Sequence, residues 1–78
     1  MLEKVITIGT VKNAQKIVEA ARNTSYEIDL IRGRYIVDLR SILGILSVDI
    51  SKPTTIRLHT ENKEEGNVFF ELIDKILK

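Results

Sequence analysis

The sequence has no cysteine, a single histidine and a single proline, and aromatic residues make up only 5% of it. Without cysteine, the chain can form neither a disulfide framework nor a thiolate metal site. One histidine and four scattered glycines leave no Ser-His-Asp set, no paired-histidine metal spacing and no glycine-rich phosphate loop. No apolar run approaches the ~20 residues of a membrane span, and the first residues do not form a signal peptide. We therefore expect a cytoplasmic protein without enzymatic activity, cofactor, metal or membrane contact.

Neither sign of charge predominates either, because 12 basic and 11 acidic residues leave a net charge of +1. Such an interspersed balance gives no electrostatic reason to bind nucleic acid. Apolar residues make up 44% of the chain and charged residues 29%, which is typical of a globular protein. The 78 residues predict one small domain, 1–78, with no linker or repeat.

Hydrophobic spacing divides the chain into seven elements in the order β-α-β-β-α-β-α. Alternation predicts strands at residues 4–8, 25–32, 34–39 and 54–60, with Gly33 in a hairpin turn. Helical spacing predicts helices that begin after Thr10, Ser41 and Asn62, with Glu65 completing a weak capping box. Asn23 is expected to end the first helix in the left-handed conformation. The expected fold is an α+β open-faced sandwich, with a four-stranded antiparallel sheet covered by helices on its apolar face.

The apolar face of each element supplies the expected core. The inward positions are Ile6 and Ile8 in the first strand; Val11, Ala14, Ile17, Val18 and Ala21 in the first helix; Tyr26, Ile28, Leu30, Tyr35, Val37 and Leu39 in the hairpin; Ile56 and Leu58 in the last strand; and Val68, Phe69, Leu72, Ile73 and Ile76 in the last helix.

The segment Arg40-Ser41-Ile42-Leu43-Gly44-Ile45-Leu46-Ser47 resembles a family motif. It is similar to the sequence around the regulatory serine of HPr, the histidine-containing phosphocarrier of bacterial sugar phosphotransferase systems, where the pattern is close to K-S-I-M-G-hydrophobic-M-S. The likeness extends more weakly over residues 14–77. The fold that this resemblance implies agrees with the order of elements read from hydrophobic spacing.

The resemblance also places the carrier site, and the histidine is missing there. The family has His-x-Arg-Pro-Ala at the start of the first helix, where this chain has Thr10-Val11-Lys12-Asn13-Ala14. A threonine phosphoester is a poor phosphoryl donor, so Thr10 is most simply a helix cap, with Lys12 near a generic anion site. The remaining histidine, His59, occupies an outward strand position, where a lone histidine is usually only solvated. A residual phosphocarrier that uses another residue remains the alternative.

Ser41 is the stronger functional candidate. In the resembling family the matching serine is phosphorylated by HPr kinase, and this controls binding to a transcriptional regulator. Members that lack the carrier histidine but keep the serine form the catabolite-repression HPr type, which this chain resembles. The simpler interpretation is that Ser41 only caps a short helix.

The apolar residues Ile42, Leu43 and Leu46 match the surface that HPr uses to bind protein partners. Two of the three could instead belong to the core, with one exposed by chance. Ile31 and Ile36 face outward across the hairpin, either as a simple cross-strand pair or as part of a self-association face. The sequence thus predicts a regulatory or binding module, with a residual phosphocarrier or a structural homodimer as alternatives.

Overall fold

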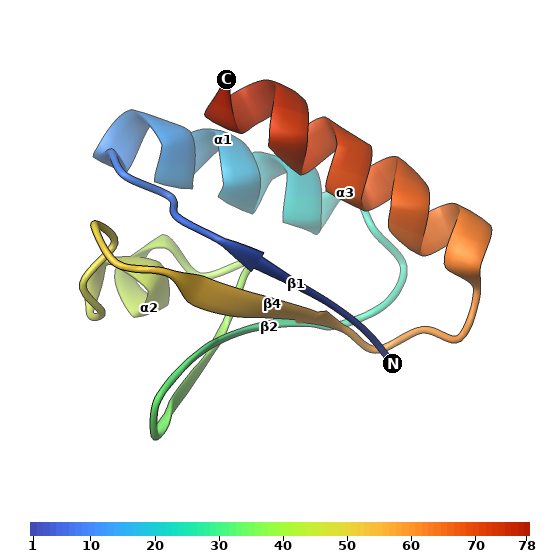
Figure 1. Ribbon diagram of the computed structural model, residues 1–78, viewed down its shortest axis with the longest axis horizontal. Helices are drawn as coiled ribbons and strands as arrows, with labels where there is room; N and C mark the ends of the chain where they lie inside the picture. The colour runs from blue at the N-terminus through green and yellow to red at the C-terminus, as the bar shows by residue number, and fades with distance from the viewer.

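A computed structural model describes all residues from 1 to 78, and Figure 1 shows its seven elements. They are β1 (Leu2–Ile6), α1 (Val11–Arg22), β2 (Ile28–Arg32), β3 (Tyr35–Asp38), α2 (Ile42–Leu46), β4 (Thr54–Leu58) and α3 (Lys63–Leu77). The predicted order β-α-β-β-α-β-α is confirmed.

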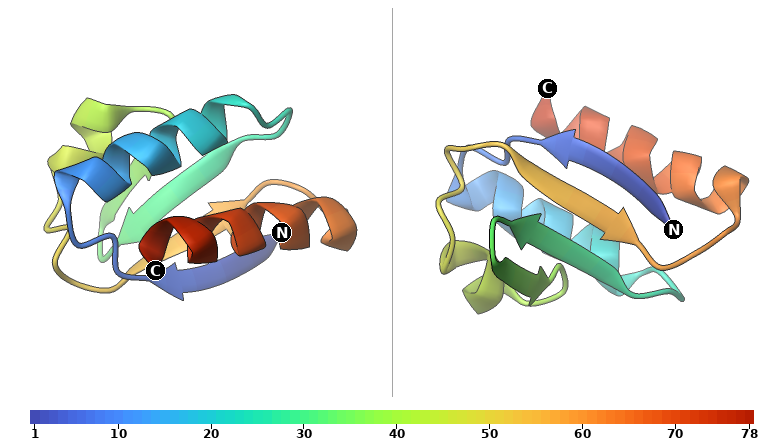
Figure 2. Two further views of the ribbon diagram at one scale, coloured as in Figure 1. Left: turned by 90° about the horizontal axis from the view of Figure 1, so that it is seen from above. Right: turned by 60° about the horizontal axis from the view of Figure 1, so that its bottom comes forward.

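The four strands form one antiparallel sheet in the order β1-β4-β2-β3. Successive side chains of a strand point to opposite faces, and one face of this sheet carries the apolar set. Helices α1 and α3 lie across that face, and no helix covers the opposite one (Figure 2). The predicted open-faced sandwich is confirmed, and the uncovered face is called the open face below.

The core lies between the sheet and the two long helices. The fully buried side chains include Ile17 of α1, Ile73 of α3 and Ile56 of β4. β1 begins and ends two residues earlier than predicted, yet Ile6 and Ile8 are both buried, as expected. Past the end of β1, the backbone N–H of Gly9 donates to the Ile50 carbonyl at 2.8 Å, which holds the two connecting loops together.

Four residues predicted to face the core are exposed instead. Val11 is 49% exposed because the first turn of α1 extends past the ends of the strands (Figure 1). Tyr35 is 67% exposed because it lies next to the hairpin turn, beyond the helices. Val68 and Leu72 are 68% and 43% exposed because α3 turns Phe69 and Ile73 toward the sheet, and one helix has only one buried stripe.

The predicted N-caps are confirmed for all three helices. The side-chain oxygens of Thr10, Ser41 and Asn62 accept hydrogen bonds from Asn13 N, Gly44 N and Glu65 N. These bonds satisfy backbone donors that a helix leaves unpaired in its first turn.

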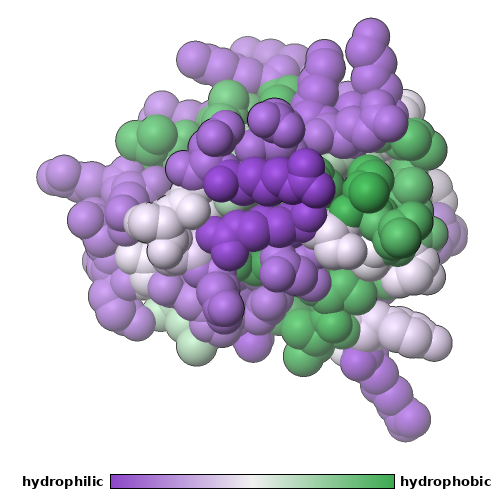
Figure 3. Space-filling model, turned by 180° about the vertical axis from the view of Figure 1, so that it is seen from behind, coloured by the Kyte–Doolittle hydropathy of each residue, from purple (hydrophilic) through white to green (hydrophobic).

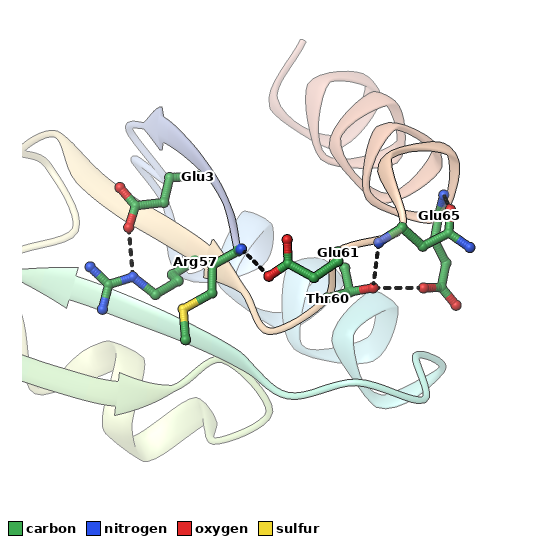
Figure 4. Close-up of polar contacts among 7 residues, drawn as sticks. Glu3, Arg57, Thr60, Glu61 and Glu65 are labelled. Carbon is green, nitrogen blue, oxygen red and sulfur yellow. Dashed lines mark hydrogen bonds and ion pairs between the residues drawn. The ribbon is translucent and has the colours of Figure 1, made fainter.

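Two details at the helix ends differ from the prediction. Asn23 ends α1 with φ of −90° and not in the left-handed region; its backbone N–H donates to the carbonyls of the last turn, and its Nδ2 donates to the Glu19 carbonyl at 3.1 Å. At the start of α3 the Glu65 carboxylate does not return to the N-cap backbone as in a full capping box. The carboxylate instead accepts a hydrogen bond from the Thr60 hydroxyl at 3.0 Å. Thr60 Oγ1 in turn accepts from the backbone N–H of Asn62 (Figure 4).

Gly66 lies where α3 packs against Leu2 of β1 and Leu58 of β4. It is buried, and an added Cβ would overlap Cδ1 of Leu2 and lie 3.3 Å from Cδ1 of Leu58. Because Gly66 has no side chain, α3 can pack this closely against the Leu2 side chain of β1.

Candidate functional site

The start of α1 is organised by a threonine. Thr10 has φ of −131° and ψ of 156°, and its Oγ1 accepts from Asn13 N at 3.1 Å. The Asn13 side chain in turn donates to the Ile8 carbonyl at 3.0 Å, which fixes the turn into the helix. Lys12 is exposed beside it and makes no hydrogen bond or ion pair. The Thr10 hydroxyl thus caps α1, as the sequence predicted.

His59 lies far from the start of α1. It directly follows β4 on the open face, where its Nε2 is 2.6 Å from Oδ2 of Asp29. Ile6, near the start of α1, pairs with Thr54 at the other end of β4. The length of the strand, about 17 Å at 3.4 Å per residue, therefore separates His59 from that helix start. The structure does not bring His59 together with Thr10 or Lys12.

Ser41 is exposed at the N-terminus of α2. It has φ of −105° and ψ of 107°, and its Oγ accepts from Gly44 N at 3.1 Å. The Ser41 backbone N–H donates to the Asp38 carbonyl, so the cap is fixed directly to the end of β3. The hydroxyl oxygen therefore sits beside the free N–H groups of the first turn, where a helix best accommodates negative charge.

Arg40, the residue before this cap, anchors α2 to the rest of the molecule. Its guanidinium donates to the carbonyls of Ala21 at 3.1 Å, Thr24 at 3.0 Å and Tyr26 at 2.7 Å, and to Thr24 Oγ1 at 3.2 Å. These acceptors lie at the end of α1 and in the loop before β2. This role could not be predicted from the sequence, because an arginine beside a helix cap has no local pattern that distinguishes it from a solvated one.

The outer surface of α2 is apolar. Ile45 is completely buried, Leu43 is 80% exposed, Leu46 is 40% exposed, and Ile42 is partly buried. A helix of five residues has room for only one anchor in the core, so its remaining apolar side chains face outward. Figure 3 shows hydrophobic surface gathered on the right, where α2 lies in that view. We call Ile42, Leu43 and Leu46 the α2 surface.

A shallow depression of about 520 Å³ lies between the hairpin turn and the end of α2. Its lining includes Arg32, Arg34 and Asp49. Hydrogen bonds from the Ser51 hydroxyl and backbone hold the pKa of the Asp49 carboxyl below its ordinary value, and Lys52 and Arg32 add to the effect. Nowhere in the chain is a group of three or more histidine, aspartate or glutamate side chains placed to hold a metal ion.

Comparison with known proteins relates this geometry to one family. The family model described as "PTS HPr component phosphorylation site" matches residues 10–77. The crystal structure of HPr-C-His from Thermoanaerobacter tengcongensis superimposes with a TM-score of 0.79 at 22% identity, covering 99% of this chain and 96% of that one. A histidine-containing phosphocarrier protein of Mycoplasma gives a TM-score of 0.73 at 16% identity, covering 97% of both chains.

At these identities the two structures demonstrate a shared fold, while the family model adds the relationship in sequence. A comparison with curated protein sequences finds no significant match. None of the helices has the length and apolar character that crossing a membrane requires.

Proposed function

The chain belongs to the HPr family of the phosphotransferase system, and we propose that it acts as a regulatory binding module through Ser41 and the α2 surface. We propose further that it does not carry phosphate on the first helix, although it has the phosphocarrier fold. The observation that carries the proposal is the exposed Ser41 hydroxyl at a helix N-terminus, directly beside exposed leucines.

The argument against a carrier role rests on Thr10. A carrier must pass its phosphoryl group onward, which a nitrogen nucleophile that is neutral near pH 7 allows and a threonine hydroxyl does not. The Thr10 hydroxyl is also engaged as the cap of α1, with Asn13 N at 3.1 Å. His59 is too far along β4 to act at this position, and its Nε2 is already in contact with Asp29.

The argument for regulation rests on what a phosphate at Ser41 would change. It would add about 1.5–2 negative charges and several acceptor oxygens at the N-terminus of α2, where unpaired backbone donors and the helix dipole stabilise it. The same charges would lie beside Leu43 and Leu46, which a partner would otherwise meet as a mainly apolar surface. Phosphorylation would thereby select between partners that prefer the apolar and the charged form of this surface.

The partners that the family suggests are HPr kinase and a transcriptional regulator. The first test is to incubate the protein with HPr kinase and ATP and to map the phosphate by mass spectrometry, with an authentic HPr as positive control. We expect label on Ser41, loss of label in Ser41→Ala and retention in Ser47→Ala. Because Ser41→Ala also removes a cap worth about 1 kcal/mol, circular dichroism must first establish that this variant is folded. An unlabelled protein beside a labelled HPr would contradict the regulatory proposal.

The second test concerns the α2 surface. Leu43→Lys should weaken binding to whichever of these two partners recognises the protein, whereas Val68→Lys should not. The two side chains are similarly exposed, at 80% and 68%, but Val68 lies on α3. Equal losses in both variants would show that binding does not depend on α2.

The residual-carrier alternative has its own assay. Phosphoenolpyruvate and the first enzyme of the phosphotransferase system should leave no acid-labile phosphate on the protein. Acid-labile phosphate on His59 would establish a carrier activity and overturn the proposal.

A further inference from the structure

A row of three apolar residues and one threonine, called the apolar band below, crosses the open face of the sheet. Val5, Thr55, Ile31 and Ile36 come from β1, β4, β2 and β3, and the register places each directly opposite the next. Val5 is 66% and Ile36 is 61% exposed. Helices cover the other face only, so no part of the chain covers this band (Figure 2, right). A contiguous apolar row of this kind marks an interaction surface more often than an isolated exposed side chain does.

Charges of opposite sign flank the band. On one side the next row of outward residues contains Glu3, Arg57, Asp29 and Asp38. Glu3 and Arg57 pair with each other at 2.6 Å (Figure 4), and Asp29 contacts His59, which leaves Asp38 as the acidic side chain of that row without a side-chain partner. On the other side Arg34 follows the hairpin turn, two residues before Ile36, and makes no hydrogen bond or ion pair.

We propose that the open face binds a second copy of this chain, with the two copies related by a two-fold axis that runs along the apolar band. A rotation of 180° about that axis places each band residue against its own equivalent. It also places the acidic side of one copy over the basic side of the other. Asp38 of each copy then lies over Arg34 of the other, so the contact is self-complementary in both apolar surface and charge.

The size of the face determines how strong the contact is. The face is four strands wide, at about 4.8 Å per strand, and three rows of outward residues long, at about 6.8 Å per row. Its area is therefore roughly 400 Å² per copy. About 800 Å² in total is below the ~1,200 Å² of a standard stable interface. The dimer should therefore form at high protein concentration and dissociate on dilution.

The experiment is sedimentation velocity over a wide range of protein concentration. Wild type should move from monomer toward dimer as concentration rises. Ile36→Lys and Val5→Lys should each remain monomeric, and Leu43→Lys should associate as wild type does. If two copies instead paired through their β3 edges, association would depend on Ile36 but not on Val5. If they met through α2, association would depend on Leu43. Either pattern would overturn the proposal. A wild type that stays monomeric at millimolar concentration would also overturn it.

Charge exchange tests the orientation. Arg34→Asp and Asp38→Arg should each weaken association several-fold, because each places like charges together at two symmetric positions. Mixed in equal amounts, the two variants should form a heterodimer in which both contacts are again attractive. Because the Asp38 carboxylate accepts from the Arg40 backbone N–H, circular dichroism must show that Asp38→Arg is folded. Folded variants that fail to associate when mixed would refute the two-fold arrangement. Neither outcome depends on phosphorylation of Ser41.

Discussion

The anchoring of α2 by Arg40 leads to a quantitative prediction. Arg40→Met keeps the aliphatic stem and removes the guanidinium, which donates to three backbone carbonyls and one hydroxyl. Hydrogen bonds from a charged donor contribute about 1.5–3 kcal/mol each when buried, and these are only part-buried, so the total loss should be about 2–4 kcal/mol. A protein of 78 residues has a free energy of unfolding of roughly 4–12 kcal/mol, so the variant would lose a large share of it.

Urea unfolding followed by circular dichroism measures this loss. With an m value near 1 kcal/mol per molar urea, the midpoint should fall by about 2 M or more. Arg34→Met is the matched control, because that arginine is exposed and makes no hydrogen bond, and its midpoint should not change. Amide hydrogen exchange in Arg40→Met should accelerate more around residues 21–26 than in β1, where only the global loss of stability acts. A loss below about 0.5 kcal/mol, within the range of ordinary surface substitutions, would refute the anchoring role.

Three further predictions concern the core and the start of α3. Ile45→Ala should lower the free energy of unfolding by about 2–4 kcal/mol because Ile45 is completely buried, whereas Leu43→Ala should change it by less than about 0.5 kcal/mol; urea midpoints compare them. Burial, and to a smaller extent the charge of Glu65, raise the pKa of the Tyr26 hydroxyl. The unfolded chain therefore ionises first, and the free energy of unfolding should fall as the pH rises above the ordinary pKa of tyrosine. Glu65→Gln should lower the pKa of Tyr26, which an NMR titration measures. Gly66→Ala should change the free energy of unfolding in urea by less than about 1 kcal/mol, because the atom that an added Cβ would overlap is the end of the flexible Leu2 side chain, which can move aside, and alanine has the better helix propensity.

Local patterns in the sequence were sufficient to predict most of the fold. Alternating side chains and a glycine turn define the hairpin of β2 and β3, and the predicted pairing of Ile31 with Ile36 is confirmed by the register. The caps could be predicted because Thr10 and Ser41 act on residues three positions away. Both kinds of signal lie within a few residues of the feature they predict.

What the sequence could not predict depends on the contact between distant elements. The exposure of Val68 and Leu72 follows from how α3 is rotated over the sheet, since hydrophobic spacing alone defines a wider stripe than one contact can bury. The role of Arg40 depends on carbonyls from 14 to 19 residues away. The apolar band required the strand order β1-β4-β2-β3, which brings Val5 into line with the hairpin isoleucines.

The bonds of Arg40 have a mechanical consequence for the whole chain. The residue that precedes the Ser41 cap holds Thr24 and Tyr26, and these two line a groove between α1 and α3. Any event that shifts the first turn of α2 must stretch those bonds, so it would be transmitted to a region that the α2 surface never touches. The Arg40 guanidinium is thus a direct physical contact between the segment that carries the Ser41 cap and the residues of that groove.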